Sequence, residues 1–346
     1  MRLEAEKFII RLRRPFRIAH GSSVTRETIL VHLHDEKGGI DAHGEGALPP
    51  YYPSTAAACL AWLNRIALEG DSAAWADACA AGGSPETAAG RVALEIALQD
   101  LTAQRAGRPI WQLWGLNPAR IPSCWRTLSI PSTEKELLDM LDEVVSLGSK
   151  SIKLKSGSGD LGWDVKCIQL AAERPIRLGL DANEGWTPEE AAQVLPRLAD
   201  RRVVFVEQPV CRDVWRWQEL RSRLGEAKIP PLVADESARN EGDLVALRGL
   251  AEAVNVKVLK AGGLDAALRW ISLARAIGMR VMVGVMVETG IGRSAAAQLA
   301  PLADWLDIDP PDDIPAAPMI GFRVEGDRLM LSDRPGLGLS QVPVEG

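Results

Sequence analysis

The residues of this chain that could do chemistry are ionisable side chains that close a series of short apolar runs. Five of them follow one another at spacings of 26, 26, 28 and 22 residues, namely Lys155, Asp181, Glu207, Asp235 and Lys257. Neighbouring positions and the last two runs add Lys153, Asn183, Glu236, Glu288, Asp307 and Asp309. Any one of these residues alone could be an exposed strand end or a helix cap. Charges placed at random would not return to the end of one run after another, so the set predicts a functional site.

Three of these residues suit a metal ion. Asp181, Glu207 and Asp235 supply hard carboxylate oxygens, which favour Mg²⁺ with open positions for water and substrate. A substrate carboxylate bound to that ion would acidify the neighbouring α-proton, because the metal stabilises the enediolate that deprotonation forms. Lys155 and Lys257 flank the three carboxylates in chain order. We therefore predict that these two lysines are the acid and the base.

A third lysine, Lys153, lies two residues before Lys155 in the run SIKLK. Side chains repeat every two residues along a β-strand, so both lysines would point to the same side. A lysine must be neutral to act as a base, and a neighbouring cation lowers its pKa. We therefore expect Lys153 to tune or orient Lys155.

These run ends can meet only if the runs are neighbouring strands. The runs span residues 123–130, 151–155, 176–182, 203–209, 231–236, 253–260, 280–288 and 305–309, and amphipathic helical patterns such as 133–148, 187–200 and 264–278 lie between them. Near-continuous apolar strands that alternate with helices indicate a parallel sheet covered on both faces. Eight such runs favour a closed β/α barrel, in which the C-terminal strand ends share the mouth where active sites lie.

The two ends of the chain follow a different pattern. Alternating residues around a turn at 35–39 predict a hairpin, helical patterns follow at 54–70 and 86–107, and the turn-rich tail 321–339 is strand-like. We expect an α/β fold, a modified TIM-type (β/α) barrel with an α+β capping domain built from the N-terminal region and the C-terminal tail. The predicted capping domain spans 1–119 and about 318–346, and the predicted barrel domain spans 120–317.

Composition and charge exclude several classes of protein. The net charge of −6 comes without a basic tract, which argues against a nucleic-acid or membrane partner. Five cysteines, odd in number and without a C-x-x-C pair, indicate a reducing compartment. The charged N-terminal stretch does not resemble a signal peptide, and the apolar run 281–287 is too short to span a bilayer. We expect a cytoplasmic homo-oligomer that acts on a small molecule.

One motif favours a different function. G-S-G-D-L-G at 157–162 matches G-x-G-x-x-G between a strand and a helix, and Asp181 lies near the offset of a ribose ligand. This pattern is typical of an NAD-dependent oxidoreductase. A dinucleotide-binding strand is normally apolar to its end, however, and this one carries two lysines. That fold also leaves Glu207, Asp235 and Lys257 without a role.

The strand-end motifs resemble those of the enolase superfamily, in its muconate-lactonizing-enzyme subgroup, and most closely those of the dipeptide epimerases. The similar segments are K-L-K at 153–155, D-A-N at 181–183, V-E-Q-P at 206–209, A-D-E-S at 234–237 and N-V-K-V-L-K-A-G-G at 255–263. The resemblance implies two acid/base catalysts and one Mg²⁺ site per chain, with the residues Lys155, Lys257, Asp181, Glu207 and Asp235. Lys260 would lie outside the site.

The segment L-D-I-D-P at 306–310 resembles the motif with which dipeptide epimerases bind the substrate's α-ammonium group. Asp307 and Asp309 would share one strand face and form an anionic subsite. Gly21 stands where the Ala-Glu epimerases carry an arginine for the side-chain carboxylate, which argues against L-Ala-D/L-Glu as the substrate. The predicted substrate contacts are Asp307, Asp309, Glu288, Asn183, His20 and Tyr51.

The predicted function is a Mg²⁺-dependent dipeptide epimerase, an isomerase that carries out a 1,1-proton transfer at the α-carbon of the C-terminal residue. One lysine would remove the proton, and the other would deliver a proton to the opposite face. A muconate cycloisomerase or an o-succinylbenzoate synthase-like enzyme is the alternative on the same scaffold, and neither needs an ammonium subsite. A catalytically silent acid-binding protein is the alternative from a different class.

Overall fold

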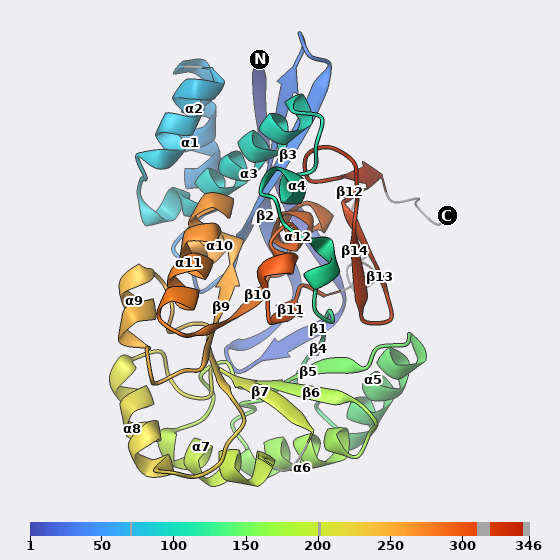
Figure 1. Cartoon of the computed structure of the whole chain (residues 1–346), viewed down its shortest axis with the longest axis vertical. Helices are drawn as coiled ribbons and strands as arrows, with labels where there is room; N and C mark the ends of the chain where they lie inside the picture. Colours follow the sequence, from blue (N-terminus) through green and yellow to red (C-terminus); the bar gives the residue numbers. More distant parts are fainter. Residues whose placement is uncertain (70, 200–201, 310–318, 342–346) are drawn as a thin grey trace.

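A barrel of parallel strands forms one end of the molecule, and an antiparallel N-terminal sheet with its helices forms the other (Figure 1). The structure is a computed structural model, and it describes residues 1–69, 71–199, 202–309 and 319–341. In Figure 1 the N-terminus and α1–α3 lie at the top, and β5–β7 with α6–α8 lie at the bottom. In the described ranges, no helix is long and apolar enough to cross a membrane.

The barrel contains eight strands whose spatial order follows the chain. They are β4 (Arg126–Leu128), β5 (Ser151–Lys155), β6 (Arg177–Asp181), β7 (Val203–Glu207), β8 (Leu232–Ala234), β9 (Ala253–Lys257), β10 (Arg280–Gly284) and β11 (Trp305–Asp307). A parallel bridge between Cys124 and Leu306 joins the first strand to the last, and the Trp125 N–H donates to the Leu306 carbonyl at 2.8 Å. This confirms the fold class that the repeat of apolar runs predicts.

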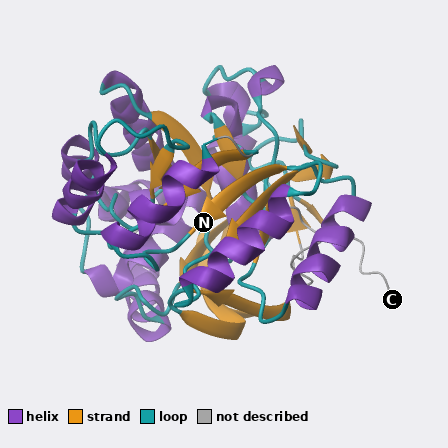
Figure 2. Cartoon of the chain, turned by 90° about the horizontal axis from the view of Figure 1, so that it is seen from below, coloured by secondary structure: helices purple, strands orange, loops and turns teal. Residues whose placement is uncertain are grey.

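Helices follow the strands and surround them when the molecule is seen from below (Figure 2). They are α5 (Glu134–Ser146), α6 (Leu161–Ala172), α7 (Pro188–Val194), α8 (Val214–Leu224), α9 (Glu241–Ala246), α10 (Val258–Ala261), α11 (Leu264–Ala276) and α12 (Gly290–Ala297). Side chains cap several of these helices at their N-termini, such as Thr133 at α5 and Thr187 at α7. The capping groups satisfy backbone N–H groups that have no partner inside the helix.

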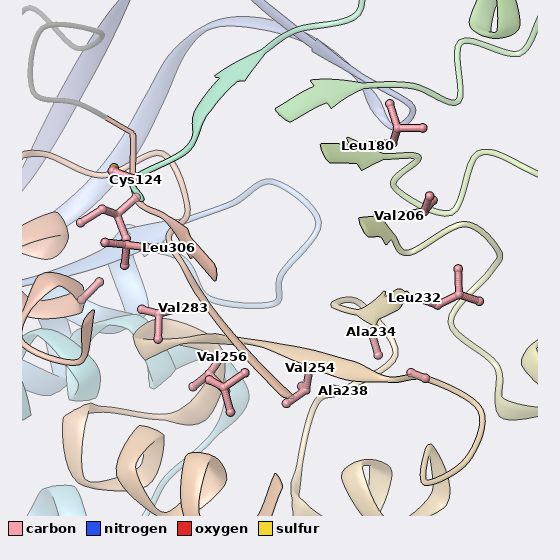
Figure 3. Close-up of a cluster of buried hydrophobic side chains, with 14 of the residues drawn as sticks. Cys124, Leu180, Val206, Leu232, Ala234, Ala238, Val254, Val256, Val283 and Leu306 are labelled. Atoms are coloured by element: carbon pink, nitrogen blue, oxygen red, sulfur yellow. The ribbon is translucent and has the colours of Figure 1, made fainter. Parts of the chain in front are cut away.

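Alternate residues of each barrel strand point to opposite sides, as the two-residue period requires. One set packs outward against the helices, and Figure 3 shows members of it on successive strands, among them Leu180, Val206, Leu232, Val254, Val283 and Leu306. The other set fills the barrel. There Phe205 packs between Trp125 and Trp305, with ring centroids 4.8 and 5.3 Å away. A Cβ at Gly179 would overlap the Phe205 ring, so glycine makes room for it. This aromatic layer lies below the charged strand ends.

The N-terminal sheet has three antiparallel strands, β1 (Arg2–Ile18), β2 (Gly21–Asp35) and β3 (Ile40–Leu48). The turn between β2 and β3 falls at the predicted 35–39. Helices α1 (Ala56–Glu69), α2 (Ser72–Ala80) and α3 (Ala88–Arg105) follow, and a separate buried core lies between them and the sheet. The pairing of β1 with β2 shifts register between Arg11 and Phe16, so residues 12–15 bulge out of the ladder.

The C-terminal tail returns to the N-terminal unit, as predicted. It contains β12 (Met319–Ile320), the hairpin β13 (Phe322–Glu325) with β14 (Arg328–Leu331), and β15 (Ser340–Gln341), which pairs with β12. The Leu337 N–H donates to Asp100 Oδ1 on α3 at 2.7 Å. The short helix α4 (Ile110–Leu113) begins where the Ile110 N–H donates to the Gly336 carbonyl at 3.0 Å.

Two carboxylates of the N-terminal unit bind helix N-termini of the barrel. Glu45 on β3 accepts from the Thr289 N–H at 2.9 Å and from the Gly292 N–H at 2.8 Å, at the start of α12. Glu95 on α3 accepts from the Leu264 N–H at 2.8 Å, at the start of α11. Negative charge is favourable at a helix N-terminus, so these contacts fix the N-terminal unit over the barrel mouth.

Candidate active site

The charged residues at the strand ends converge on the barrel mouth. Lys155, Asp181 and Glu207 are the last residues of three adjacent strands, and the ladder pairs Lys155 with Asp181 and Asp181 with Glu207. Asp235 directly follows β8, and Lys257 ends β9. All five side chains are buried. The spacing of about one β/α unit therefore brings these residues together as predicted.

Ammonium and carboxylate groups alternate within this cluster. Lys155 Nζ lies 2.6 Å from Asp181 Oδ2, and on the other side Lys257 Nζ lies 2.6 Å from Asp235 Oδ2. Lys153 Nζ lies 2.8 Å from Glu207 Oε2 and 3.2 Å from Asp181 Oδ2. Buried charges are costly unless they are paired, and here each carboxylate has a lysine beside it.

Lys155 and Lys257 stand on opposite sides of the mouth. Between β5 and β9 lie β6, β7 and β8 in one direction and β10, β11 and β4 in the other. The two strands are therefore diametrically opposed in the eight-stranded ring. A molecule held over the carboxylates would meet one lysine on each face.

The electrostatics of the cluster differ from one residue to the next. Burial, and after it the charge of Asp181, raises the pKa of Glu207 to about 7. Burial alone would lower the pKa of Lys153, but the charges of Asp307, Glu207 and Asp181 outweigh it and hold that pKa well above its usual value. Lys153 therefore stays protonated. Burial also opposes ionisation of Asp235, yet Lys257 and Lys260 hold its pKa below the usual range.

The donor set suits a hard divalent cation. Three buried carboxylates in one place repel one another, and the raised pKa of Glu207 is a consequence. Buried acceptor atoms without a hydrogen-bond partner among the described residues lie nearby, namely Asn183 Oδ1, Glu236 Oε2 and Asn255 Oδ1. Lys153 Nζ lies between two of these carboxylates, since it contacts both Asp181 and Glu207, and in this arrangement no group of three His, Cys, Asp or Glu side chains among the described residues is close enough together to hold a metal ion.

Lys260 belongs to this cluster, although the sequence analysis placed it outside. Its Nζ lies 2.6 Å from Asp235 Oδ1 and 2.8 Å from the Asp235 carbonyl oxygen, and its side chain is buried. The apolar run 253–260 is not one strand, because β9 ends at Lys257 and α10 begins at the next residue. One helical turn returns Lys260 to the same side. The signal in the sequence was the spacing of three residues between Lys257 and Lys260, one turn of a helix. Gly262 follows and ends α10 in a left-handed conformation.

The two aspartates of L-D-I-D-P line the same cavity but do not share a strand face. Asp307 ends β11, and its carboxylate accepts from Lys153 Nζ and, at 2.9 Å, from the Thr127 hydroxyl. Asp309 lies beyond the strand with φ 45°, and its Oδ1 accepts from the Thr127 N–H at 2.8 Å. The turn therefore carries Asp309 to the mouth. Burial, then the charge of Asp307, raises the pKa of Asp309.

A cavity of about 220 Å³ lies between the N-terminal sheet and the barrel mouth. From the barrel it is lined by Lys153, Lys155, Asn183, Lys257, Asp307 and Asp309, and from the N-terminal unit by Phe16, Arg26 and Tyr51, among others. The Asn183 side chain is held by a hydrogen bond from its Nδ2 to Glu236 Oε1 at 3.0 Å. Most of the predicted contact residues therefore line one cavity.

Two predicted contact residues do not line this cavity. His20 lies in the turn between β1 and β2, and its Nε2 is 3.2 Å from Glu184 Oε2. Arg212 donates to both oxygens of Glu184, at 2.9 and 2.6 Å, and holds it in place. Glu288 lies beyond the end of β10 and is buried. Burial, and after it the charge of Glu45, raises the pKa of Glu288 to about 8.

The glycine-rich segment 157–162 does not form a phosphate site. The N–H groups at its start are occupied, because those of Gly157 and Ser158 donate to the Asp164 carboxylate at 2.9 and 3.1 Å. The strand before it ends in the two lysines of the barrel mouth. The motif is a loop of a closed barrel, so the interpretation as an NAD-dependent oxidoreductase was wrong.

This structure is a barrel with buried lysines and carboxylates at its strand ends and an α+β cap over them. Known proteins share this combination. Residues 136–342 match the family described as enolase C-terminal domain-like, and the chain belongs to this family. It is 30% identical over 354 residues to the L-Ala-D/L-Glu epimerase of Bacteroides thetaiotaomicron, covering 99% of this chain and 88% of that protein. It is also 30% identical to the hydrophobic dipeptide epimerase of Roseobacter litoralis, covering 98% of each chain.

The structure is similar to solved structures over nearly its whole length. The dipeptide epimerase of Cytophaga hutchinsonii, in complex with Mg and the dipeptide D-Ala-L-Val, superimposes with a TM-score of 0.88 and 26% sequence identity. The match covers 99% of this chain and 96% of that chain. The resemblance that the strand-end motifs carry therefore extends to the fold.

Proposed function

We propose that this chain is a Mg²⁺-dependent dipeptide epimerase, an isomerase that moves the α-proton of the C-terminal residue between the two faces of its carbon. The observation that carries the proposal is the pair Lys155 and Lys257 on opposite sides of one carboxylate cluster. Relatives named as dipeptide epimerases support it, because they align with this chain from end to end.

The proposed ligands of Mg²⁺ are the carboxylates of Asp181, Glu207 and Asp235. When bound, the ion stabilises the negative charge that develops on the substrate carboxylate as the α-proton leaves. Burial alone would lower the pKa of Lys257, but the charges of Asp235 and Glu207 outweigh it and hold that pKa well above its usual value. A divalent cation offsets those negative charges, so deprotonating a lysine beside them costs less free energy.

The proposed proton transfer uses one lysine on each face. The neutral lysine takes the α-proton, and the protonated lysine opposite gives its own proton to the other face, so that the two exchange roles in the reverse direction. Lys153 stays protonated among Asp307, Glu207 and Asp181. Its Nζ and that of Lys155 both contact Asp181 Oδ2, at 3.2 and 2.6 Å, which supports the orienting role proposed for it.

The proposed ammonium subsite distinguishes a dipeptide epimerase from the other enzymes considered on the same scaffold. Asp307 and Asp309 both bind Thr127 and both line the cavity, so their carboxylates lie side by side. A cationic group is the natural partner for such a pair. Muconate cycloisomerases and o-succinylbenzoate synthases act on substrates without an amine and need no such pair, so the subsite favours a dipeptide.

The remaining assignments are also proposals. Asn183 and Tyr51 line the cavity and are proposed to contact the substrate, whereas His20 and Glu288 would act from outside its lining. We propose the domain bounds 1–119 with 318–346 and 120–317, although the boundary at 317/318 lies outside the described residues. A cytoplasmic location is supported by five free cysteines. We also propose a homo-oligomeric state, which light scattering would test.

Mass spectrometry of dipeptide libraries in D₂O tests the proposed function. With Mg²⁺ present, dipeptides should gain one deuterium at the α-carbon of the C-terminal residue and yield the second diastereomer. N-acetylated versions of the same dipeptides, which lack the ammonium group, are the matched control and should react far more slowly. Exchange of N-acetyl substrates at the same rate, or no exchange of any dipeptide, would contradict the proposal.

A further inference from the structure

The barrel closes at the seam between its first and last strands, β4 and β11, and side chains take part in closing it. Among the described residues a single parallel bridge joins Cys124 to Leu306, and the Trp125 N–H donates to the Leu306 carbonyl. On its other side, β4 pairs with β5 over three residues. Beyond Leu306, towards the mouth, side chains of β11 and of the turn after it make contacts across the seam.

Thr127 on β4 makes both of these contacts. Its N–H donates to Asp309 Oδ1 at 2.8 Å, and its hydroxyl donates to Asp307 Oδ1 at 2.9 Å. In a regular ladder that N–H would bond to a carbonyl oxygen of the neighbouring strand, but here it bonds to a side chain. One residue therefore binds a carboxylate oxygen of each aspartate in the proposed ammonium subsite.

These contacts hold both carboxylates from the opposite side of the seam. The second oxygen of Asp307 accepts from Lys153 Nζ, so each of its oxygens has a donor. Asp309 has a left-handed φ of 45°, and a residue other than glycine keeps that conformation only where its surroundings support it. The hydrogen bond from the Thr127 N–H is one such support.

Thr127 is a rigid anchor for this arrangement. It lies in the ladder between β4 and β5, where it pairs with Lys153. Its β-branched side chain has few χ1 rotamers, so the hydroxyl has a narrow range of positions. Two carboxylates held side by side repel each other, and burial, followed by the charge of Asp307, raises the pKa of Asp309. The Thr127 donors oppose this repulsion and keep the two acids together before a cation binds.

We propose that Thr127 is a positioning residue of the ammonium subsite, and that its hydroxyl sets how strongly the enzyme prefers a free dipeptide to an N-acetylated one. The inference rests on the proposed function and adds a residue to its substrate subsite. An ammonium group donates up to three hydrogen bonds, so it gains most from acceptors that are already in place. Thr127 acts through Asp307 and Asp309 rather than on the reacting α-carbon.

The test is Thr127→Val, which has nearly the shape of threonine and keeps the N–H but loses the hydroxyl. The probes are L-Ala-L-Ala and N-acetyl-L-Ala-L-Ala, with Mg²⁺ present. For the free dipeptide kcat/KM should fall about tenfold or more, since hydrogen bonds to charged groups are strong. The loss should appear in KM, with kcat within about threefold of wild type, because the ammonium keeps its charge throughout the reaction. α-Proton exchange of the N-acetylated probe should change less than about twofold, because that probe has no ammonium group to bind.

Three further variants complete the experiment. Thr127→Ser restores the hydroxyl and should recover most of the lost kcat/KM. Thr127→Ala also removes the hydroxyl, should give the same pattern as Thr127→Val, and replaces it if the valine variant does not fold. Thr102→Val is the matched control, because Thr102 is exposed and its hydroxyl donates to the Leu98 carbonyl of the same helix at 2.8 Å. It should behave like the wild type. Circular dichroism and thermal unfolding check that each variant is folded.

Several results would overturn the inference. Equal losses for the two probes would mean that Thr127 only supports the barrel seam. An unchanged KM in both hydroxyl-deletion variants, or a serine variant as impaired as the valine variant, would show that the hydroxyl does not position the subsite. A loss confined to kcat would place Thr127 in the chemical step. If the wild-type enzyme exchanges the α-proton of no dipeptide, the proposed function itself fails.

Discussion

Replacing Lys257 by alanine should stop epimerisation and leave half of the proton exchange in place. Lys257 lies on β9 and Lys155 on β5, with three strands between them in either direction. Strands about 4.8 Å apart in a ring of eight give a diameter of roughly 12 Å before tilt widens it. A lysine side chain spans roughly 6 Å, so each ammonium reaches the centre of the mouth and no further.

This geometry sets the size of the effect. Neither lysine can serve both faces of a carbon held at the centre, so the remaining lysine cannot replace the one removed. The rate of epimerisation should fall by about 10²- to 10⁴-fold, the usual worth of a positioned acid or base. Lys155 should still exchange the α-proton of the diastereomer that faces it. Lys155→Ala should give the mirror-image result with the other diastereomer.

The assay is α-proton exchange in D₂O, followed by NMR separately on each diastereomer. Lys166→Ala is the matched control, because Lys166 is exposed on α6 and pairs with Glu134 at 2.7 Å. It should exchange and epimerise like the wild type. Epimerisation by Lys257→Ala at the wild-type rate would refute the two-lysine assignment. So would exchange of the same diastereomer by both active-site variants.

Three further predictions concern the metal, the ammonium subsite and the effect of pH. Exhaustive EDTA treatment should abolish activity and added Mg²⁺ should restore it, since the buried carboxylates cannot hold a substrate carboxylate without a cation; activity that survives chelation would contradict the metal site. Asp309→Asn should lower kcat/KM for dipeptides at least about tenfold more than for N-acetylated analogues, because charge-assisted contacts to ammonium are strong; equal losses would favour a cycloisomerase. Burial raises the pKa of Asp100 from 3.8 to about 6, despite hydrogen bonds from Leu337 and His43. The folded state then binds its proton more tightly than the unfolded state, so this group stabilises the fold below about pH 4, and the contribution is lost as pH rises through about 6. The loss is about 3 kcal/mol at most, and urea unfolding at pH 5 and 8 should show a smaller pH effect in Asp100→Asn than in the wild type.

Much of the site could be predicted because a barrel obeys two simple periods. The two-residue period of a strand puts Lys153 and Lys155 on one side, and the repeat of the β/α unit brings Asp181 and Glu207 beside them. Both rules act locally along the chain. They need no knowledge of how distant segments pack.

The errors fall where a strand ends and a turn or helix begins. The apolar run 253–260 has no mark that separates β9 from α10, so the position of Lys260 was missed. The alternation of residues suggests a strand that runs to Asp309, but β11 ends two residues earlier. A left-handed φ at Asp309 then redirects this residue. His20 depends on Glu184, a residue distant in sequence that only the folded chain brings close. Such contacts leave no periodic signal in the sequence.

The contacts of Glu45 and Glu95 have a consequence for recombination between relatives. Transplanting specificity by exchanging the whole N-terminal unit would remove the carboxylates that bind the starts of α12 and α11. Buried N–H groups left without a partner cost about 1–3 kcal/mol each, so a chimera that lost both acids would be poorly stable. A graft limited to β1 and β2 carries the bulge and Arg26 but leaves β3 and α3 in place. Strands β1 and β2, which contribute residues to the cavity wall, can therefore be exchanged separately from the segments that hold the N-terminal unit on the barrel.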